Sequence, residues 1–388
     1  MSYIFKVDHS FYEKQNINIS FKNIQSTEDI IIFDFTEVQN FYPYDDIDVD
    51  VFGIFYKLHK KLQNHKAKVF YICSDLNSKH RYDKFNDIVK NNKKFEIINY
   101  PFFNLPEFVD IDISSIKKNK NFCLLSYEPK IIRLMILDFF YENSNFLYSC
   151  APFYKSRNTF SKLYAPSYPY RWDVKKEKIQ IFDQYGNNRF VHTINSSISD
   201  KIIFPNGFYL PENSKKLDKL DNKCFYDKII PDSNLMTCCD LILESYVTGD
   251  SIFFTEKTWK SILHERPFLL FGSKKQNNTL NNLGFELYEE LFDYSFDLFD
   301  GNKKLFSFID QVEKYLNLDS NFFNYEIHNN IKEKILFNKN IILNLYKLNY
   351  YNNILDFVIN LKPFEIQKIS KKNSNSIINF FIGKHIDV

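Results

Sequence analysis

Short apolar runs alternate with helix-like patterns along the first 140 residues. Between the runs, apolar side chains recur at a spacing of four, as at Ile54, Leu58 and Leu62, which is typical of an amphipathic helix. Because these elements follow one another on short connections, the pattern favours a parallel sheet with helices on its faces. The predicted strands lie at 30–35, 68–73, 95–98 and 122–125, and the predicted helices at 52–65, 82–90 and about 132–139.

The alternation stops near Ala151 and resumes at Ile179. Three prolines between positions 152 and 169 punctuate an aromatic and basic stretch that ends at Asp173, and we expect this stretch to be a crossover or to line a cleft. Further strands are predicted at 179–182, 202–204, 241–244 and 268–271, with helices after Thr255, Asn278 and Lys304 and a mainly helical region beyond Asn321.

The segment 251–272 carries the clearest chemical signal. It predicts a short apolar strand at 251–254, an N-cap at Thr255, a helix that opens with Glu256 and Lys257, and a buried strand at 267–271 closed by Gly272. A helix N-terminus offers free N–H groups and a partial positive charge. The carboxylate of Glu256 can accept from sugar hydroxyls, and the ammonium of Lys257 can neutralise phosphate. The segment therefore predicts a site for a phosphorylated sugar; the alternative is an ordinary capped helix whose first turn is solvated.

A second segment, 118–140, has the same strand–turn–helix form. Its turn follows the apolar run at Ser126, and Arg133 falls in the first turn of the predicted helix. A cation at a helix N-terminus opposes the helix dipole, so this arginine predicts a bound anion. The alternative is that Arg133 reaches solvent or pairs with Glu128 or Asp138.

Together the two segments resemble the donor-site motifs of the family 10 glycosyltransferases, the α-1,3/4-fucosyltransferases. Ser126 and Arg133 match the first motif of that family at the same separation. The second motif is matched by Glu244-Ser245, by Thr255-Glu256-Lys257 and by the strand from Pro267 to Gly272. The segments 283–285 and 292–297 look more like glycosyltransferase-like proteins of large DNA viruses and phages.

The resemblance implies an α/β fold of the GT-B type, with two Rossmann-like domains facing across a cleft and a helical C-terminal extension. Ligands of such sheets bind at the carboxyl ends of the strands. The expected domains are an acceptor-side domain at 1–155, a crossover loop at 156–178, a donor-binding domain at 179–320 and the extension at 321–388.

The resemblance also implies the reaction and its residues. A sugar would move from a nucleotide-diphosphate donor to a glycan, protein or other hydroxyl acceptor, with inversion and without a metal. Arg133 and Lys257 would stabilise the departing diphosphate, because preorganised charge is commonly the largest catalytic contribution. Glu256 would contact the donor sugar or ribose, and Glu244 would orient these groups. The remaining donor-site candidates are Ser126, Ser245, Thr255 and Gly272.

Inversion needs a general base near the acceptor hydroxyl. Asp34 and Asp75 are the candidates, since each follows the apolar part of a predicted strand, where a cap or turn role is the alternative. No metal site and no resident cofactor is expected, because the Asp-x-Asp pairs at 48–50 and 110–112 lie in settings typical of solvated surface. Phe253-Phe254 replaces the family's Tyr-Val, so the nucleotide base and a fucose donor stay open.

Composition adds limits rather than chemistry. The 50 basic and 48 acidic residues nearly balance, so no global field favours nucleic acid or membrane. Six cysteines without metal-binding spacing indicate a reducing compartment. The sequence shows neither a signal-peptide pattern nor 18 consecutive apolar residues, which predicts a cytoplasmic protein without a membrane anchor. Abundant Asn, Lys, Ile, Phe and Tyr reflect AT-rich codons, as in a viral genome.

Two other functions stay open from the sequence. One is a non-catalytic glycan-binding protein that keeps the GT-B shell. The other is an enzyme that glycosylates modified DNA bases, for which a basic groove would be needed. The basic residues that could supply this groove are Lys155, Arg157, Lys162 and Arg171.

Overall fold

The computed structural model describes just under half of the chain. The described residues are 2–6, 30–35, 61–79, 82–83, 87, 95–102, 118–126, 132, 136, 139–140, 143–150, 172–175, 178–182, 188–193, 236–244, 247 and 252–347. The strand predicted at 202–204 lies outside them. Of the helix predicted at 52–65, residues 61–65 are described; 61 and 62 are helical, 63 and 64 form a turn, and the helix ends there. Of the helix predicted at 82–90, residues 82, 83 and 87 are described and are helical.

The first sheet has four parallel strands in the order β1-β2-β3-β4. Its strands are β1 (Ser2–Lys6), β2 (Ile30–Phe35), β3 (Lys68–Cys73) and β4 (Glu96–Asn99). The strands predicted at 30–35, 68–73 and 95–98 are confirmed as β2, β3 and β4. Apolar runs of this kind are typical of parallel strands that are covered on both faces. β1 was not predicted. It pairs with β2 in register from Ser2 opposite Ile30.

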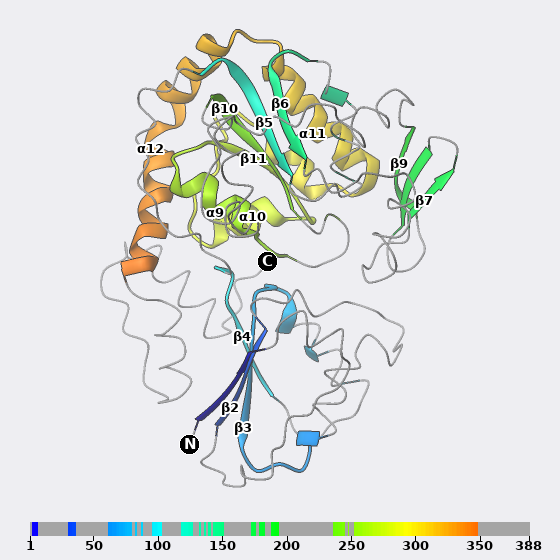
Figure 1. The fold of residues 1–388 in the computed structure, drawn as a ribbon, viewed down its shortest axis with the longest axis vertical. Helices are drawn as coiled ribbons and strands as arrows, with labels where there is room; N and C mark the ends of the chain where they lie inside the picture. Colours follow the sequence, from blue (N-terminus) through cyan, green and yellow to red (C-terminus); the bar gives the residue numbers. More distant parts are fainter. Residues whose placement is uncertain are drawn as a thin grey trace, which may run out of the picture.

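The second sheet is also parallel and has the order β11-β10-β5-β6. It contains β5 (Lys120–Ser126), β6 (Phe146–Cys150), β10 (Thr237–Leu243) and β11 (Phe268–Phe271). All seven residues of β10 are buried. Figure 1 shows this sheet above the first one, with α9 and α10 on the side turned towards the first sheet.

The membership of β5 corrects the sequence interpretation. We expected the strand at 122–125 to extend the first sheet, inside a domain that ends at 155. Instead β5 pairs with β10, with Phe122 opposite Cys239, so the two sheets divide between Asn99 and Lys120. An apolar run shows that a strand is buried but carries no signal for its neighbour, because parallel partners are joined through distant segments.

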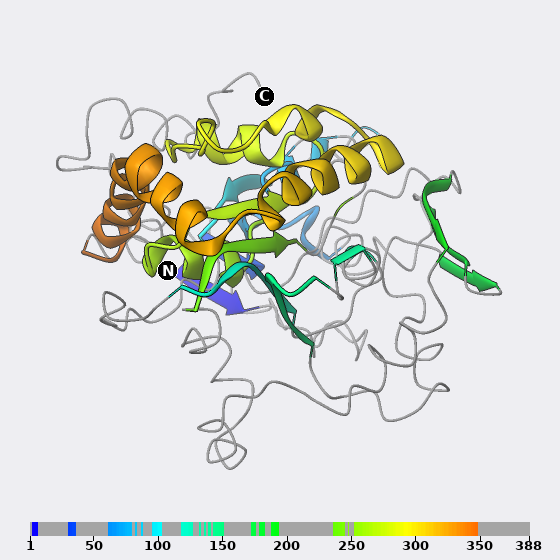
Figure 2. The same ribbon diagram turned by 90° about the horizontal axis from the view of Figure 1, so that it is seen from above.

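In the described part of the chain, one helix lies between β10 and β11, and four helical elements follow β11. They are α9 (Glu256–Leu263), α10 (Gln276–Asn282), the 3₁₀ turn η2 (Tyr294–Leu298), α11 (Gly301–Leu316) and α12 (Ser320–Lys347). The helical region predicted beyond Asn321 is confirmed as far as Lys347. The helices predicted after Asn278 and Lys304 begin earlier, at Gln276 and Gly301. Figures 1 and 2 show α12 running past α9 and the second sheet, and it contacts both.

A small antiparallel sheet corrects a second expectation. The predicted loop at 156–178 contains the strand β7 (Trp172–Lys175), which pairs with β8 (Lys178–Phe182); β9 (Asn188–Thr193) follows. The strand expected at 179–182 therefore forms, but in a hairpin rather than in a Rossmann-like sheet. Only two residues join β7 to β8, and so short a connection permits antiparallel pairing alone.

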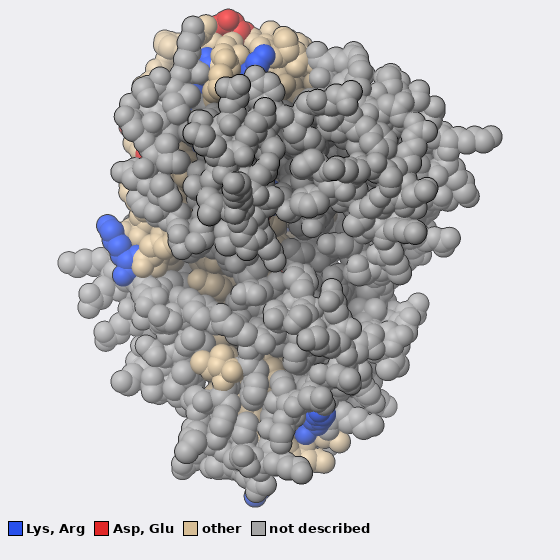
Figure 3. Space-filling model, viewed as in Figure 1, with Lys and Arg blue, Asp and Glu red and all other residues tan. Residues whose placement is uncertain are grey.

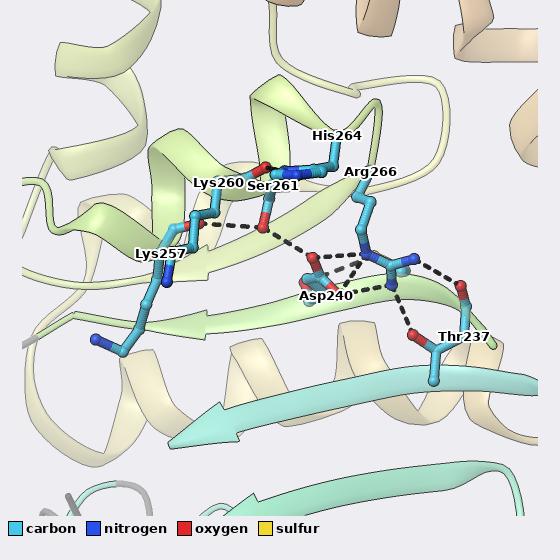
Figure 4. A network of polar contacts seen from close by, with 8 residues as sticks. Thr237, Asp240, Lys257, Lys260, Ser261, His264 and Arg266 are labelled. Carbon is cyan, nitrogen blue, oxygen red and sulfur yellow. Dashed lines mark hydrogen bonds and ion pairs between the residues drawn. The ribbon is translucent and has the colours of Figure 1, made fainter. Parts of the chain in front are cut away.

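A buried ion pair links the end of the α9 crossover to the start of β10. The guanidinium of Arg266 donates to both oxygens of Asp240, at 2.6–3.0 Å, and also to Thr237 (Figure 4). Ser261 on α9 donates its hydroxyl to Asp240 as well, at 2.8 Å. Arg266 is 1% exposed and Asp240 4%, so neither charge has solvent as an alternative partner.

Asp240→Ala should therefore destabilise the protein strongly. The variant leaves the Arg266 guanidinium buried without its counter-ion, which typically costs about 3–5 kcal/mol of the free energy of unfolding. The exposed pair Lys274–Asp300, at 3.1 Å, provides the matched control, and Lys274→Ala should cost less than about 1 kcal/mol. Denaturant titrations of both variants check this; equal losses would contradict it.

Candidate functional site

The strand order of the second sheet creates a topological switch point. From β5 the chain steps outward to β6, whereas from β10 it steps outward in the other direction to β11. The two crossovers therefore leave from neighbouring carboxyl ends, after Ser126 and after Leu243. In open α/β sheets, ligands bind outside the carboxyl ends of the strands at such a point. Both motifs selected from the sequence begin at this place.

Helix α9 starts at this edge as predicted. Thr255 is its N-cap, with extended backbone angles (φ −87°, ψ 171°), and its hydroxyl accepts from the N–H of Lys257 at 3.4 Å. Glu256 and Lys257 form the first turn. Figure 4 shows the Lys257 side chain directed away from the Asp240 network, towards the ends of the strands. The ammonium of Lys257 and the positive end of the helix dipole thus share one location.

Glu256 and Lys257 form an ion pair that remains partly open to solvent. Their Oε1–Nζ distance is 2.5 Å, and their side chains are 21% and 17% exposed. Burial raises the pKa of Glu256, but the charge and hydrogen bond of Lys257, helped by Lys260, lower it to about 2. Glu256 is therefore ionised at neutral pH and is an acceptor only.

Glu244 supports this turn from below and is fully buried. Its Oε1 accepts from the backbone N–H of Thr255 at 3.0 Å and from the hydroxyl of Thr258 at 2.7 Å. Burial raises the pKa of Glu244, although these two hydrogen bonds and Lys257 act against the increase. Its Oε2 has no hydrogen-bond partner in the described part of the structure. Glu244 thus fixes the start of α9, and the orienting role that the resemblance implied stays a prediction.

The segment before α9 is extended but is not the strand expected at 251–254. Residues 252–255 have no regular secondary structure. The N–H of Ile252 donates to Oδ1 of Asp75 at 3.2 Å, and the carbonyl of Ile252 accepts from the N–H of Leu76 at 3.0 Å. The carbonyl of Phe253 accepts from the Gln276 side chain at 2.7 Å. Side chains and a loop thus supply the hydrogen-bond partners that a neighbouring strand would otherwise have supplied.

The two candidate bases lie at the carboxyl side of the first sheet. Asp75 follows β3 by two residues, is 4% exposed, and its Oδ1 also accepts from the N–H of Asn77 at 3.0 Å. The contact with Asn77 closes a local turn, and the contact with Ile252 joins this loop to the segment before α9. Asp34 is the fifth residue of β2, paired with Lys6 and Ile72, and its side chain is outside the description. A role in proton transfer stays a prediction for both.

Gly272, which follows β11, occupies a position with no room for a side chain. A Cβ there would lie 2.0 Å from Oε1 of Gln276. That carboxamide is held at both ends, because its oxygen accepts from the N–H of Ser273 at 2.8 Å and its nitrogen donates to Phe253. Gly272 thus lets the Gln276 side chain pack against the end of β11, and its contact with a donor stays a prediction.

Other candidates fall outside the described residues. They are Arg133, Ser245, the side chain of Ser126, and the basic set Lys155, Arg157, Lys162 and Arg171. In Figure 3 the described Lys and Arg side chains form separate small groups on the face shown. Among the described residues, no group of three or more His, Cys, Asp or Glu is placed to hold a metal ion, and no helix there is long and apolar enough to cross a membrane.

Sequence reasoning missed two residues that hold the site together, Thr258 and Gln276, and it selected Asp75 as a candidate base without its contact to Ile252. Thr258 lies three residues after the N-cap, and that spacing could have placed it on the same helix face as Thr255. Gln276 and Asp75 had no comparable signal for their contacts, since both reach backbone groups far along the chain, at Phe253 and Ile252.

Searches against protein-family models, curated proteins and solved structures found no match to this chain. The resemblance to the family 10 glycosyltransferases therefore rests on the two sequence motifs alone.

Gly272→Ala should lower the free energy of unfolding by about 1–3 kcal/mol, because the new methyl group displaces an anchored side chain. Gln276→Ala removes the obstacle. The double variant should then be more stable than the sum of the two single losses predicts, since the two positions are in direct contact. Denaturant titrations of the three variants check this, and strict additivity would contradict the packing argument.

Glu256 should contribute a pH-dependent part of the stability. Folding lowers its pKa from 4.5 to about 2, so between these values the unfolded chain binds more protons than the folded protein. The contribution is complete above pH 4.5 and is lost as the pH falls towards 2. Glu256→Gln should therefore make the thermal midpoint depend less on pH over this range than the exposed control Glu313→Gln does. Parallel curves of thermal midpoint against pH for the two variants would refute this.

Proposed function

We propose that this protein is a glycosyltransferase that transfers a sugar from a nucleotide-diphosphate donor to a hydroxyl acceptor, with its donor diphosphate at the N-terminus of α9. One observation carries the proposal: the Glu256–Lys257 turn begins beside the topological switch point between β10 and β5. A capped helix end with a lysine at that place is suited to a diphosphate by both position and charge.

The charges at this turn suit the departure of a diphosphate. As the bond between the anomeric carbon and the phosphate oxygen breaks, its electron pair leaves with the diphosphate. Lys257 and the positive end of the α9 dipole would stabilise that charge. Arg133 follows β5, the neighbour of β10, and would add a bidentate contact from the second motif.

Glu256 is suited to the positive charge that develops on the sugar as the sugar–phosphate bond breaks. Its carboxylate is ionised, so it can accept from a sugar or ribose hydroxyl and offset the positive charge that develops on the sugar. When a diphosphate binds, the Lys257 ammonium would be shared between the phosphate and Glu256. The acceptor oxygen then forms the new bond to the anomeric carbon, and its proton passes to a base, for which Asp34 and Asp75 are the candidates.

A GT-B-like arrangement of the two sheets is part of the proposal. Supporting it, the loop after β3 contacts the segment that leads into α9, through the hydrogen bonds between Asp75, Leu76 and Ile252. The carboxyl side of the first sheet thus approaches the switch point of the second. An acceptor held by the first sheet would meet a donor held at α9.

The function is tested by incubating the purified protein with a panel of nucleotide sugars and measuring donor hydrolysis and transfer, with and without EDTA. We expect turnover of at least one donor, and its persistence in EDTA. Transfer only to modified-base DNA would favour the DNA-glycosylating alternative, and glycan binding without any turnover would favour the non-catalytic one. No binding of any nucleotide diphosphate would reject the donor site.

Lys257→Ala should weaken nucleotide-diphosphate binding about ten- to hundredfold, because one charge-assisted contact typically contributes about 1.5–3 kcal/mol. Glu256→Gln should reduce turnover more than nucleotide binding, since its partner is the charge developed on the sugar. Lys303→Ala, an exposed lysine on α11, is the matched control. Calorimetric titration and steady-state kinetics measure both effects. Unchanged nucleotide-diphosphate affinity in Lys257→Ala would contradict the donor site and would favour the alternative, an ordinary capped helix.

A further inference from the structure

We propose that Asp75 is a positioning residue, through which the first sheet fixes the first turn of α9. The inference rests on the proposed function, because it assigns a purpose to the position of Glu256 and Lys257. It starts from the contacts of one residue, Ile252, which precedes α9 by four positions and is 3% exposed.

Ile252 is held on both sides of its backbone by the loop after β3. Its N–H donates to Asp75 Oδ1 at 3.2 Å, and its carbonyl accepts from the N–H of Leu76 at 3.0 Å. Asp75 is itself fixed, since the same oxygen accepts from the N–H of Asn77. Both ends of the link are buried, so water cannot readily replace these hydrogen bonds.

Each residue between Ile252 and the first turn of α9 is also held by a contact. The carbonyl of Phe253 is held by Gln276, and Phe254 is fully buried with its ring 5.5 Å from that of Trp259. The N–H of Thr255 is held by Glu244. A displacement of Ile252 must therefore either break one of these contacts or move the start of α9.

A second contact from the first sheet reaches the same helix. Phe102 lies three residues after β4, and its ring centroid is 5.2 Å from that of Trp259 on α9 and 6.4 Å from that of Phe285. Trp259 is fully buried. The loops after β3 and β4 thus contact α9 and the segment before it at two separate points, one polar and one aromatic.

The geometry separates positioning from proton transfer at Asp75. Accepting a backbone N–H needs only an oxygen at the place of Oδ1, which the amide of asparagine retains. Accepting a proton from an acceptor substrate needs a carboxylate, which asparagine lacks. Asp75→Asn and Asp75→Ala should therefore differ sharply if Asp75 positions α9, and should be equally impaired if it is the base.

The experiment measures amide hydrogen exchange in peptides that cover 252–258, together with nucleotide-diphosphate affinity and donor kinetics. The variants are Asp75→Ala, Asp75→Asn and Asp75→Ser. Serine retains a short polar group for the local turn at Asn77 but cannot extend as far as Ile252. Asp293→Ala is the control, since Asp293 accepts from the N–H and hydroxyl of Ser295 in a similar but exposed turn.

We expect Asp75→Ala and Asp75→Ser to raise exchange in 252–258 about tenfold or more and to weaken nucleotide binding by a similar factor. Their kcat should change less than their affinity, and Asp75→Asn should keep the amide exchange of 252–258 and the nucleotide affinity within about threefold of the parent. Should Asp75→Ala fail to fold, Asp75→Ser provides the same comparison. A Trp172→Phe background leaves Trp259 as the single tryptophan, whose emission should shift in the same variants.

Unchanged exchange in Asp75→Ala and Asp75→Ser would overturn the proposal, whatever the activity. Loss of transfer in Asp75→Asn with normal exchange would overturn it as well, and would assign Asp75 as the base. The proposed function fails by a different result, when the parent protein binds no nucleotide diphosphate. Raised exchange in that case would still support the link between Asp75 and α9.

Discussion

The parallel pairing of β5 with β10 is the constraint on which the rest of the structure depends. It joins segments that lie more than a hundred residues apart, with Cys239 opposite Phe122 and Leu241 opposite Leu124. Because each strand then leads outward to its own crossover, their carboxyl ends form a switch point. Without this pairing, the two motifs that resemble a nucleotide-sugar site would have no reason to lie at one edge.

Buried polar groups fix the helix that opens at this edge. Asp240 and Arg266 tie the end of the α9 crossover to β10, and Glu244 ties its beginning to the same strand. Such groups are costly to bury unless they are paired, so each also restricts the positions that α9 can adopt. Oε2 of Glu244 has no hydrogen-bond partner among the described residues, and it lies beside the turn proposed to hold the donor.

The first sheet contributes through its loops rather than its strands. Asp75 and Phe102 extend from the carboxyl side of β3 and β4 to the region of α9, so the two sheets share one local structure at Ile252 and Trp259. A site that is assembled in this way is sensitive to either sheet.

The sequence alone determined the local elements: the apolar runs of β2, β3 and β11, and the N-cap at Thr255 with its acid–base first turn. These depend on side-chain periodicity and capping, which act over a few residues. Only the tertiary structure decided that β5 belongs to the second sheet. It also decided that 252–255 form an irregular segment rather than a strand, and that Asp75 contacts the segment before α9. Those outcomes depend on hydrogen bonds between distant segments, and an apolar run or a lone aspartate carries no information about its distant partner.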